Sequence, residues 1–191
     1  MGRFSRLWPF GPPSAAGAEG VDQGSSALAR RVLMVCTGNI CRSPTAEAVL
    51  RAKLDRAGLG DRVAVASAGT TGWHEGEAPD PRARQHALLR GYDLSALRAR
   101  ALRPEDYERH DLILAMDEGH LAHLLAHAPA GSRAQLQPLL AYALRFAGTA
   151  EVPDPYYGPP QGFEQVLDLV EDACEGLVAC LAAQLPAGSA G

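Results

Sequence analysis

A cysteine and an arginine six positions apart, Cys36 and Arg42, stand in the most informative segment of the chain, Cys-Thr-Gly-Asn-Ile-Cys-Arg-Ser-Pro over residues 36–44. An apolar run at 32–35 precedes the segment, and Ser43-Pro44 is typical of a helix start. A loop between the end of a strand and the start of a helix directs its backbone N–H groups toward one point, where they can bind a tetrahedral oxyanion. The pattern therefore indicates an anion-binding loop over residues 36–42.

The side chains of this loop suggest a reaction as well as a binding site. Backbone dipoles and the helix N-terminus favour the thiolate form of a cysteine, so we expect Cys36 to be ionised at neutral pH and nucleophilic. The planar guanidinium of Arg42 can hold two phosphate oxygens at once, which lysine cannot do. Gly38 is expected to let the backbone curl without a Cβ penalty. An inert buried thiol at Cys36 is the alternative, but it leaves the rest of the segment unexplained.

Thiolate attack on an aryl phosphate also needs a proton donor, because a phenoxide leaving group has a conjugate acid with a pKa of about 10. Asp154 meets this need, since it lies in the loop 152–158, Val-Pro-Asp-Pro-Tyr-Tyr-Gly, where two prolines restrict its backbone. The same carboxyl group could later deprotonate the water that hydrolyses a phosphocysteine. Taken alone, Asp-Pro would indicate only a turn, and the motif at Cys36 is what favours a catalytic role.

The elements that must position these groups alternate along the chain. Strands are predicted at 32–35, 63–66, 111–116 and 135–139, and helices at 43–58, 81–90, 118–127 and 163–185. This alternation predicts an α/β fold with a parallel sheet covered on both faces. Residues 1–30, rich in Gly, Pro, Ala and Ser, are expected to be a disordered extension, 31–186 the folded domain and 187–191 a C-terminal tail.

Composition excludes several other classes of function. The formal net charge of −4 gives no basic surface for nucleic acid, and no stretch approaches the ~20 apolar residues that span a bilayer. Four cysteines in 191 residues are too few for a disulfide framework, and their spacing does not match a zinc site. His120, His123 and His127 are interpreted as one helix face rather than metal ligands, and His74 is the histidine expected near the cleft. We therefore expect a reduced, cytoplasmic protein without a metal.

Taken together, these motifs resemble those of the low-molecular-weight protein tyrosine phosphatases. The resemblance rests on segments 36–44 and 154–158, with further matches at 67–73, 98–100 and 115–117, and covers about residues 31–185. It implies a three-layer α/β/α fold with a four-stranded parallel sheet, a phosphocysteine intermediate and no metal or cofactor. It also implies a tyrosine-phosphorylated protein as substrate and a monomer as the expected state.

The resemblance assigns roles to further residues. The phosphate-binding loop comprises Thr37, Gly38, Asn39, Ile40, Cys41 and Arg42. Ser43 hydrogen-bonds the thiolate and eases its departure, and Asn39 orders the loop. Trp73, Tyr156 and Tyr157 form the walls of the substrate cleft.

Two positions of the pattern leave questions open. Cys41, beside the nucleophile, could form a reversible disulfide with Cys36 under oxidation, or could simply fill space in the loop. Leu97 stands where relatives commonly carry a His that supports the Asn–Ser network behind the loop. A hydrophobic side chain cannot donate a hydrogen bond to Asn39 or Ser43, which places that support, and the efficiency of the enzyme, in doubt.

Two rival functions were weighed against this one. A thioredoxin-coupled arsenate reductase uses a similar loop but needs further cysteines on a mobile middle segment, and residues 61–173 contain none. A non-catalytic phosphate-binding module would explain Leu97, but it would not require the nucleophile, the arginine and the acid to be retained together.

Overall fold

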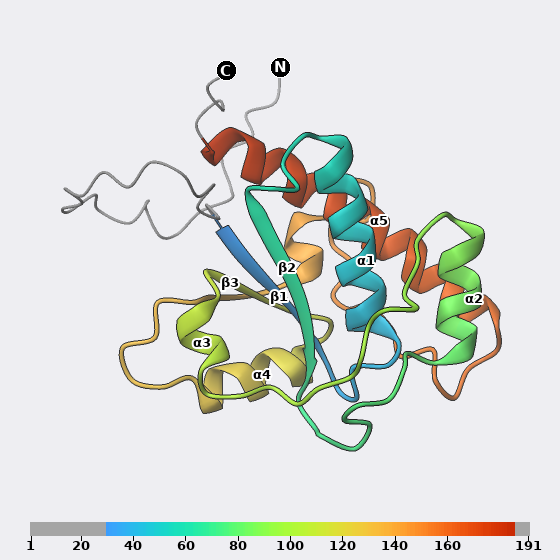
Figure 1. The fold of residues 1–191 in the computed structure, drawn as a ribbon, viewed down its shortest axis with the longest axis horizontal. Helices are drawn as coiled ribbons and strands as arrows, with labels where there is room; N and C mark the ends of the chain where they lie inside the picture. The colour runs from blue at the N-terminus through green and yellow to red at the C-terminus, as the bar shows by residue number, and fades with distance from the viewer. Residues whose placement is uncertain (1–29, 186–191) are drawn as a thin grey trace.

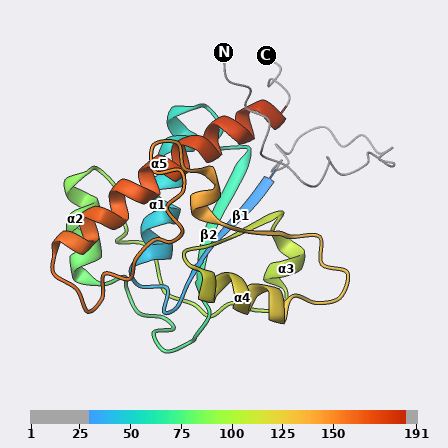
Figure 2. The same ribbon diagram turned by 180° about the vertical axis from the view of Figure 1, so that it is seen from behind.

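The computed structural model describes residues 30–185, which form a three-layer α/β/α unit around one parallel sheet (Figures 1 and 2). The strands are β1 (Arg30–Cys36), β2 (Val63–Gly69), β3 (Leu112–Ala115) and β4 (Gln135–Pro138), in the order β2-β1-β3-β4. This confirms the predicted fold class. The predicted tail at 187–191 and, apart from Arg30, the predicted extension at 1–30 lie outside the described residues.

Five α-helices and one short 3₁₀ helix belong to this part of the chain. They are α1 (Arg42–Arg56), α2 (Pro81–Leu89), α3 (Asp106–Arg109), α4 (Glu118–His127), α5 (Gln161–Gln184) and η1 (Leu139–Tyr142). Helices α1 and α5 cover one face of the sheet, with α2 beside them, and α3 and α4 cover the other (Figures 1 and 2). The short elements α3 and η1 were not predicted, because single helical turns carry no periodic pattern.

The side-chain alternation of β1 explains why both faces of the sheet are covered. Val32 and Met34 point into the core beneath α1 and α5, whereas Leu33 and Val35 point into the core beneath α3 and α4. All four are buried, as expected for a central parallel strand. Strand β1 therefore lies in the middle of the hydrophobic core, and its last residue, Cys36, occupies a fixed position at the carboxyl edge of the sheet.

The carboxyl end of β2 supports the segment that follows β1. The N–H groups of Thr70 and Thr71 donate to the carbonyls of Cys36 and Thr37, at 2.8 and 3.0 Å. A Cβ atom on Gly69 would lie 2.6 Å from the Thr37 carbonyl oxygen, so only glycine permits this close approach. Strand β2 consequently extends to Gly69, three residues beyond its predicted end.

Helix α5 is amphipathic, and none of the helices within residues 30–185 is both long and apolar enough to cross a membrane.

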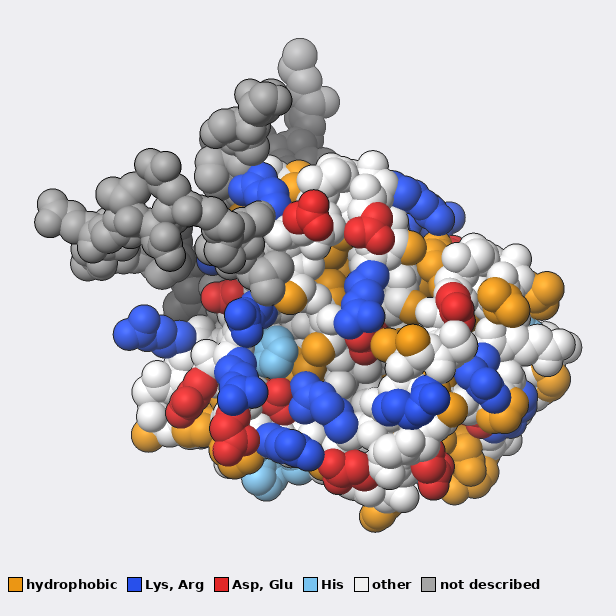
Figure 3. Space-filling model, viewed as in Figure 1, with side chains coloured by type: hydrophobic (Ala, Val, Ile, Leu, Met, Phe, Trp, Pro, Cys, Tyr) orange, Lys and Arg blue, Asp and Glu red, His pale blue; other side chains and the backbone are white. Residues whose placement is uncertain are grey.

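On the face of the molecule seen in Figure 3, basic side chains are spread among acidic ones. Three arginines form ion pairs with neighbouring carboxylates: Arg51 with Glu47, Arg100 with Asp106, and Arg103 with Glu75. Positive charge is thus partly neutralised within the surface.

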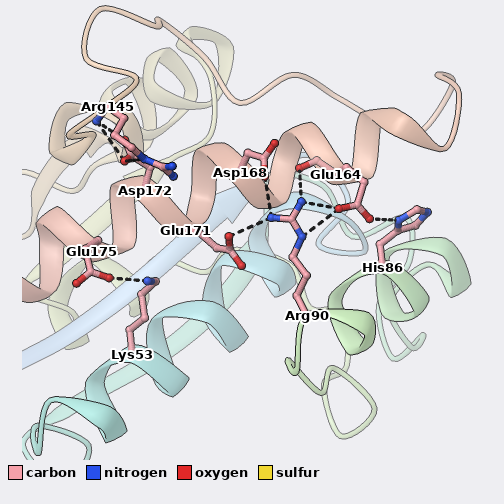
Figure 4. Close-up of polar contacts among 9 residues, drawn as sticks. All are labelled: Lys53, His86, Arg90, Arg145, Glu164, Asp168, Glu171, Asp172 and Glu175. Carbon is pink, nitrogen blue, oxygen red and sulfur yellow. Dashed lines mark hydrogen bonds and ion pairs between the residues drawn. The ribbon is translucent and has the colours of Figure 1, made fainter.

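A cluster of charged side chains joins α2 to α5 (Figure 4). Arg90, which follows the last residue of α2, contacts the carboxylates of Glu164, Asp168 and Glu171 at 2.5 to 3.0 Å. His86 approaches Glu164 at 2.5 Å. The carboxylates hold the pKa of Arg90 above its ordinary value, against the effect of burial. Arg90 thus connects the C-terminal end of α2 to three positions on α5.

We expect Arg90→Met, which keeps much of the aliphatic stem, to lower the free energy of unfolding by about 1–2 kcal/mol, because three carboxylates lose a partly buried partner. Arg103→Met is the control, since Arg103 pairs with the carboxylate of Glu75 at the surface, with side-chain exposures of 62% and 48%, and should lose less than ~1 kcal/mol. Urea unfolding of both variants measures the difference. Equal losses would show that the cluster adds nothing beyond an ordinary surface ion pair.

Candidate active site

The loop predicted to bind an anion follows β1 directly and curls back toward α1. Its left-handed residue is Asn39, with φ of 56°, a conformation that asparagine tolerates better than most residues. Gly38 is favoured for a different reason from the one predicted. A Cβ atom on Gly38 would lie 3.0 Å from the His74 ring, so glycine makes room for a neighbouring side chain rather than for a turn.

The prediction that Ser43 caps α1 is wrong. The helix begins at Arg42, and Cys41, at the cap position, makes no side-chain cap hydrogen bond. The Ser43 hydroxyl lies instead 3.0 Å from the Cys36 sulfur and accepts a hydrogen bond from the Asn39 amide at 2.9 Å. The hydroxyl is therefore placed to form a hydrogen bond with the thiol. The helix N-terminus has no side-chain cap that would compete with an incoming anion.

A buried chain of hydrogen bonds extends behind the loop. The Asn39 amide group also donates to the Ser67 hydroxyl at 2.8 Å, and Ser67 donates to the carboxylate of Glu47 at 2.5 Å. The side-chain oxygen of Asn39, Oδ1, accepts a hydrogen bond from the backbone N–H of Arg100 at 3.0 Å. Every polar group of the Asn39 side chain thus has a hydrogen-bond partner. These bonds hold in place the residue with the left-handed backbone conformation.

This network forms without the histidine that Leu97 replaces. Leu97 packs against the large hydrophobic core instead of reaching the loop. Burial raises the pKa of Glu47, and the Ser67 hydrogen bond and Arg51 at 2.6 Å oppose only part of this rise. The side chains of Ser67 and Glu47 therefore provide the support that the sequence placed in doubt.

The guanidinium of Arg42 is almost fully buried and lies between two carboxylates. Nη1 is 2.8 Å from Asp117, at the end of β3, and Nη2 is 2.8 Å from Asp154. Nη1 also donates to the carbonyl of Val152 at 3.3 Å. The side chain of Arg42 is 5% exposed and that of Asp154 48% exposed. Asp117 thus holds the arginine from inside, while Asp154 occupies its solvent side.

Asp154 is positioned by its own loop. Its other carboxylate oxygen accepts the backbone N–H of Tyr156 at 3.1 Å, a turn that the flanking prolines favour. The backbone N–H of Val152 donates to the carbonyl of Met116 at 2.8 Å, which fastens the loop to the end of β3. A residue far along the chain is in this way brought next to the segment after β1.

A cleft of about 180 Å³ opens over the loop. It is lined by Cys36, Thr37, Gly38, Ile40, Cys41, Arg42, Trp73, His74, Asp154, Tyr156 and Tyr157. The predicted site residues that do not line it, Asn39 and Ser43, lie directly behind it. Trp73 and Tyr157 stand at the rim with 75% and 96% of their surfaces exposed. Such exposed aromatic rings beside a cleft are typical of a surface that binds a partner group.

The two cysteines of the loop have different surroundings. Burial, followed by the nearby charge of Asp80, raises the pKa of the Cys41 thiol well above its ordinary value. Cys36 instead has the Ser43 hydroxyl beside its sulfur. Both are free thiols. Cys41 is therefore kept protonated and is unsuited to be the nucleophile, although it lines the same cleft.

Sequence reasoning missed the parts played by Asp117 and His120. The prediction that His74 alone among the histidines lies near the cleft is wrong, because His120 is buried and lies 2.8 Å from the Thr37 hydroxyl. His123 and His127 stack on each other farther along α4. A signal existed, since Asp117 follows closely after the buried strand β3 and is a favourable N-cap for the next helix.

Within the described residues, no three or more His, Cys, Asp or Glu side chains are arranged to hold a metal ion. What the cleft does combine is a thiol, a buried guanidinium and a partly exposed carboxyl group, around the loop between β1 and α1. That set can bind a phosphate monoester, attack its phosphorus and supply a proton to the leaving group. The fold and the site together define a phosphatase with a cysteine nucleophile.

Comparison with known proteins supports this assignment to a class of phosphatases. Residues 31–187 match the model of the low molecular weight phosphotyrosine protein phosphatase family. The chain is 48% identical over 157 residues to a low molecular weight protein-tyrosine-phosphatase of Streptomyces coelicolor, covering 81% of this chain and 95% of the relative. This chain belongs to the low-molecular-weight protein tyrosine phosphatase family and is a protein-tyrosine phosphatase.

Solved structures show the same fold. A protein tyrosine phosphatase from Entamoeba histolytica superposes with a TM-score of 0.77 at 38% identity, over 81% of this chain and 98% of that one. Wzb of Vibrio vulnificus, in complex with benzylphosphonate, superposes with a TM-score of 0.69 at 28% identity, over 80% and 99% of the two chains.

We expect Ser67→Ala to lower kcat on an aryl phosphate roughly five- to tenfold, because Asn39 and Glu47 each lose a hydrogen-bond partner behind the loop. Ser132→Ala is the control, since it removes one hydroxyl that donates to the Tyr107 carbonyl away from the cleft. Steady-state kinetics of both variants test this. Unchanged kcat in Ser67→Ala would mean that the loop holds its shape without the network.

Proposed function

We propose that this enzyme hydrolyses phosphotyrosine in proteins, and small aryl phosphates, through a phosphocysteine intermediate on Cys36. The observation that carries the proposal is the meeting of three groups at one cleft: the Cys36 thiol, the Arg42 guanidinium and the Asp154 carboxyl group. Each comes from a different position in the chain, and each has a separate part in the reaction.

In the first step the Cys36 sulfur attacks phosphorus. An S–P bond forms as the P–O bond to the tyrosyl ring breaks, and Asp154 gives its proton to the departing oxygen. The backbone amides of the loop and Arg42 balance the negative charge of the three equatorial oxygens. The Ser43 hydroxyl, 3.0 Å from the sulfur, steadies the thiolate beforehand.

Phosphate binding and acid catalysis are coupled through Arg42. In the free enzyme Nη2 contacts Asp154, so an incoming phosphate must take the place of that carboxylate. This exchange releases the Asp154 carboxyl group from the guanidinium, so that it is available to the leaving oxygen in the first step. Asp117 keeps its contact on Nη1 and holds the arginine in place during the exchange.

In the second step water attacks the phosphocysteine. Asp154, now ionised, takes a proton from the water as its oxygen bonds to phosphorus, and the S–P bond breaks to release phosphate and thiolate. The Ser43 hydroxyl donates to the departing sulfur and stabilises it. The enzyme returns to its starting state without a metal or cofactor.

The preference for tyrosine rests on the walls of the cleft. Trp73, Tyr156 and Tyr157 can stack against a substrate ring, and the Tyr156 and Tyr157 rings meet edge to face at 4.8 Å. Arg82 lies over the outer side of Tyr156, 5.5 Å from its centroid, and supports that wall. Binding of benzylphosphonate by the Vibrio vulnificus relative is consistent with an aryl group in this position.

The proposal includes a partner, an oligomeric state and a compartment for the enzyme. A tyrosine-phosphorylated protein is its partner in the reaction. A monomer suffices, because one chain supplies every group that lines the cleft. A reducing compartment such as the cytoplasm suits it, since Cys36 and Cys41 are both free thiols and the reaction needs the reduced nucleophile.

We expect Asp154→Ala to slow hydrolysis by about 10²–10³-fold for aryl phosphates with basic leaving groups, and far less for nitrophenyl-type esters that depart without a proton. Cys36→Ser should abolish turnover of all of them. Values of kcat/KM across a leaving-group series measure this, because kcat/KM reports the first step and is not changed by the loss of the base in the second step. An equal loss in Asp154→Ala across the series would remove Asp154 from the acid role, and activity in Cys36→Ser would exclude the phosphocysteine.

We also propose that Cys41 protects the nucleophile from irreversible oxidation by forming a disulfide with a Cys36 sulfenic acid, releasing water. Cys41→Ser should keep near-normal activity but lose the recovery by thiols after peroxide treatment. Cys180→Ser, which alters a partly exposed cysteine on α5, should recover as the wild type does. If Cys41→Ser recovers equally well, Cys41 only fills space in the loop.

A further inference from the structure

His120 forms part of a closed set of contacts that the reaction described above does not use. Its Nε2 lies 2.8 Å from the hydroxyl of Thr37, the first residue after the nucleophile. Its Nδ1 lies 2.8 Å from Oδ1 of Asp117. The second oxygen of Asp117 holds Nη1 of Arg42, and Nη2 of Arg42 approaches the Thr37 hydroxyl at 3.4 Å. Four side chains therefore form a ring under one wall of the cleft.

When the imidazole is neutral, the contact with Asp117 favours a proton on Nδ1, because an unprotonated Nδ1 would face a carboxylate oxygen at 2.8 Å. The Arg42 N–H donates to the Thr37 oxygen, so the Thr37 hydroxyl is free to donate to an unprotonated Nε2. The proton then stands on Nδ1 and faces the Asp117 carboxylate. The Nδ1 contact is bent, so its attraction is chiefly electrostatic.

The surroundings of His120 favour that neutral form. The residue is 5% exposed, and burial lowers its pKa to about 4, even though the charge of Asp117 opposes the shift. A proton added to Nε2 would face the Thr37 hydroxyl, which would then lose its acceptor. The backbone also holds the ring in place, because the N–H of His120 donates to Asp117 at 2.8 Å.

We propose that His120 is a positioning residue: by accepting the Thr37 hydroxyl and holding Asp117, it aims the Arg42 guanidinium before phosphate binds. The inference rests on the proposed function, since it concerns the phosphate site of that reaction. A guanidinium that is already oriented loses less freedom on binding phosphate, so the gain appears in phosphate affinity as well as in turnover.

Kinetics of five variants (His120→Ala, His120→Gln, Thr37→Val, the double variant and His123→Ala) test this, with inorganic phosphate as the inhibitor. His120→Ala should lower kcat/KM for an aryl phosphate and weaken phosphate inhibition, each roughly tenfold, as expected for one lost hydrogen bond to a charged-group network. His120→Gln, whose carbonyl oxygen can accept from Thr37, should recover most of both. Thr37→Val combined with His120→Ala should lose little more than either single change. His123→Ala, on the same helix, should leave both constants unchanged.

Several results would overturn the proposal. These are a change of less than twofold in His120→Ala, equal values for the Gln and Ala variants, or multiplicative losses in the double variant. If His120→Ala does not fold, the ring nitrogen chemical shifts of the wild type decide, because they must show the Nδ1–H tautomer near neutral pH and an Nε2–H signal refutes it. Wild-type protein that lacks aryl phosphatase activity would refute the proposed function instead, and phosphate binding would still test His120.

Discussion

The rest of the site depends on one constraint, the burial of the Arg42 charge. A guanidinium that is 5% exposed must keep anionic partners at all times, because an unpaired buried charge is far more costly than a paired one. In the free protein Asp117 and Asp154 fill that need. In the proposed reaction, phosphate binding exchanges one anion for another, and the displaced carboxylate is the group proposed to act as the acid. Binding and catalysis share a single electrostatic arrangement.

The fold provides that arrangement through the central strand. Strand β1 is buried on both faces, so the loop after Cys36 begins from a fixed point, with β2 on one side and β3 on the other. The end of β2 brings Gly69 against the loop backbone and Ser67 against Asn39. The end of β3 brings Asp117 to Arg42. Ligand sites at the carboxyl edge of a parallel sheet arise from this convergence.

Much of this could be predicted from sequence, because the loop, its flanking elements and the Asp-Pro-Tyr-Tyr segment are local patterns. The residues that were missed or misjudged act through contacts between distant segments. His120 was interpreted only as part of one helix face, since no local pattern reveals that α4 turns that position toward Thr37. Ser43 resembled a helix cap, but the nearby thiol and Asn39 amide compete for its hydroxyl. Leu97 suggested a weakened network, whereas Ser67 and Glu47 maintain it.

The covalent step on Cys36 is the central claim, and trapping the intermediate tests it most directly. Mixing the enzyme with a phosphotyrosine peptide and quenching in acid within milliseconds should leave one phosphoryl group per chain, on the proteolytic fragment that contains Cys36. The ³¹P resonance should be that of a phosphorothiolate, and the species should form and decay at rates that account for turnover. Rapid turnover without a phosphorylated fragment, or a phosphoryl group on any other residue, would contradict the account.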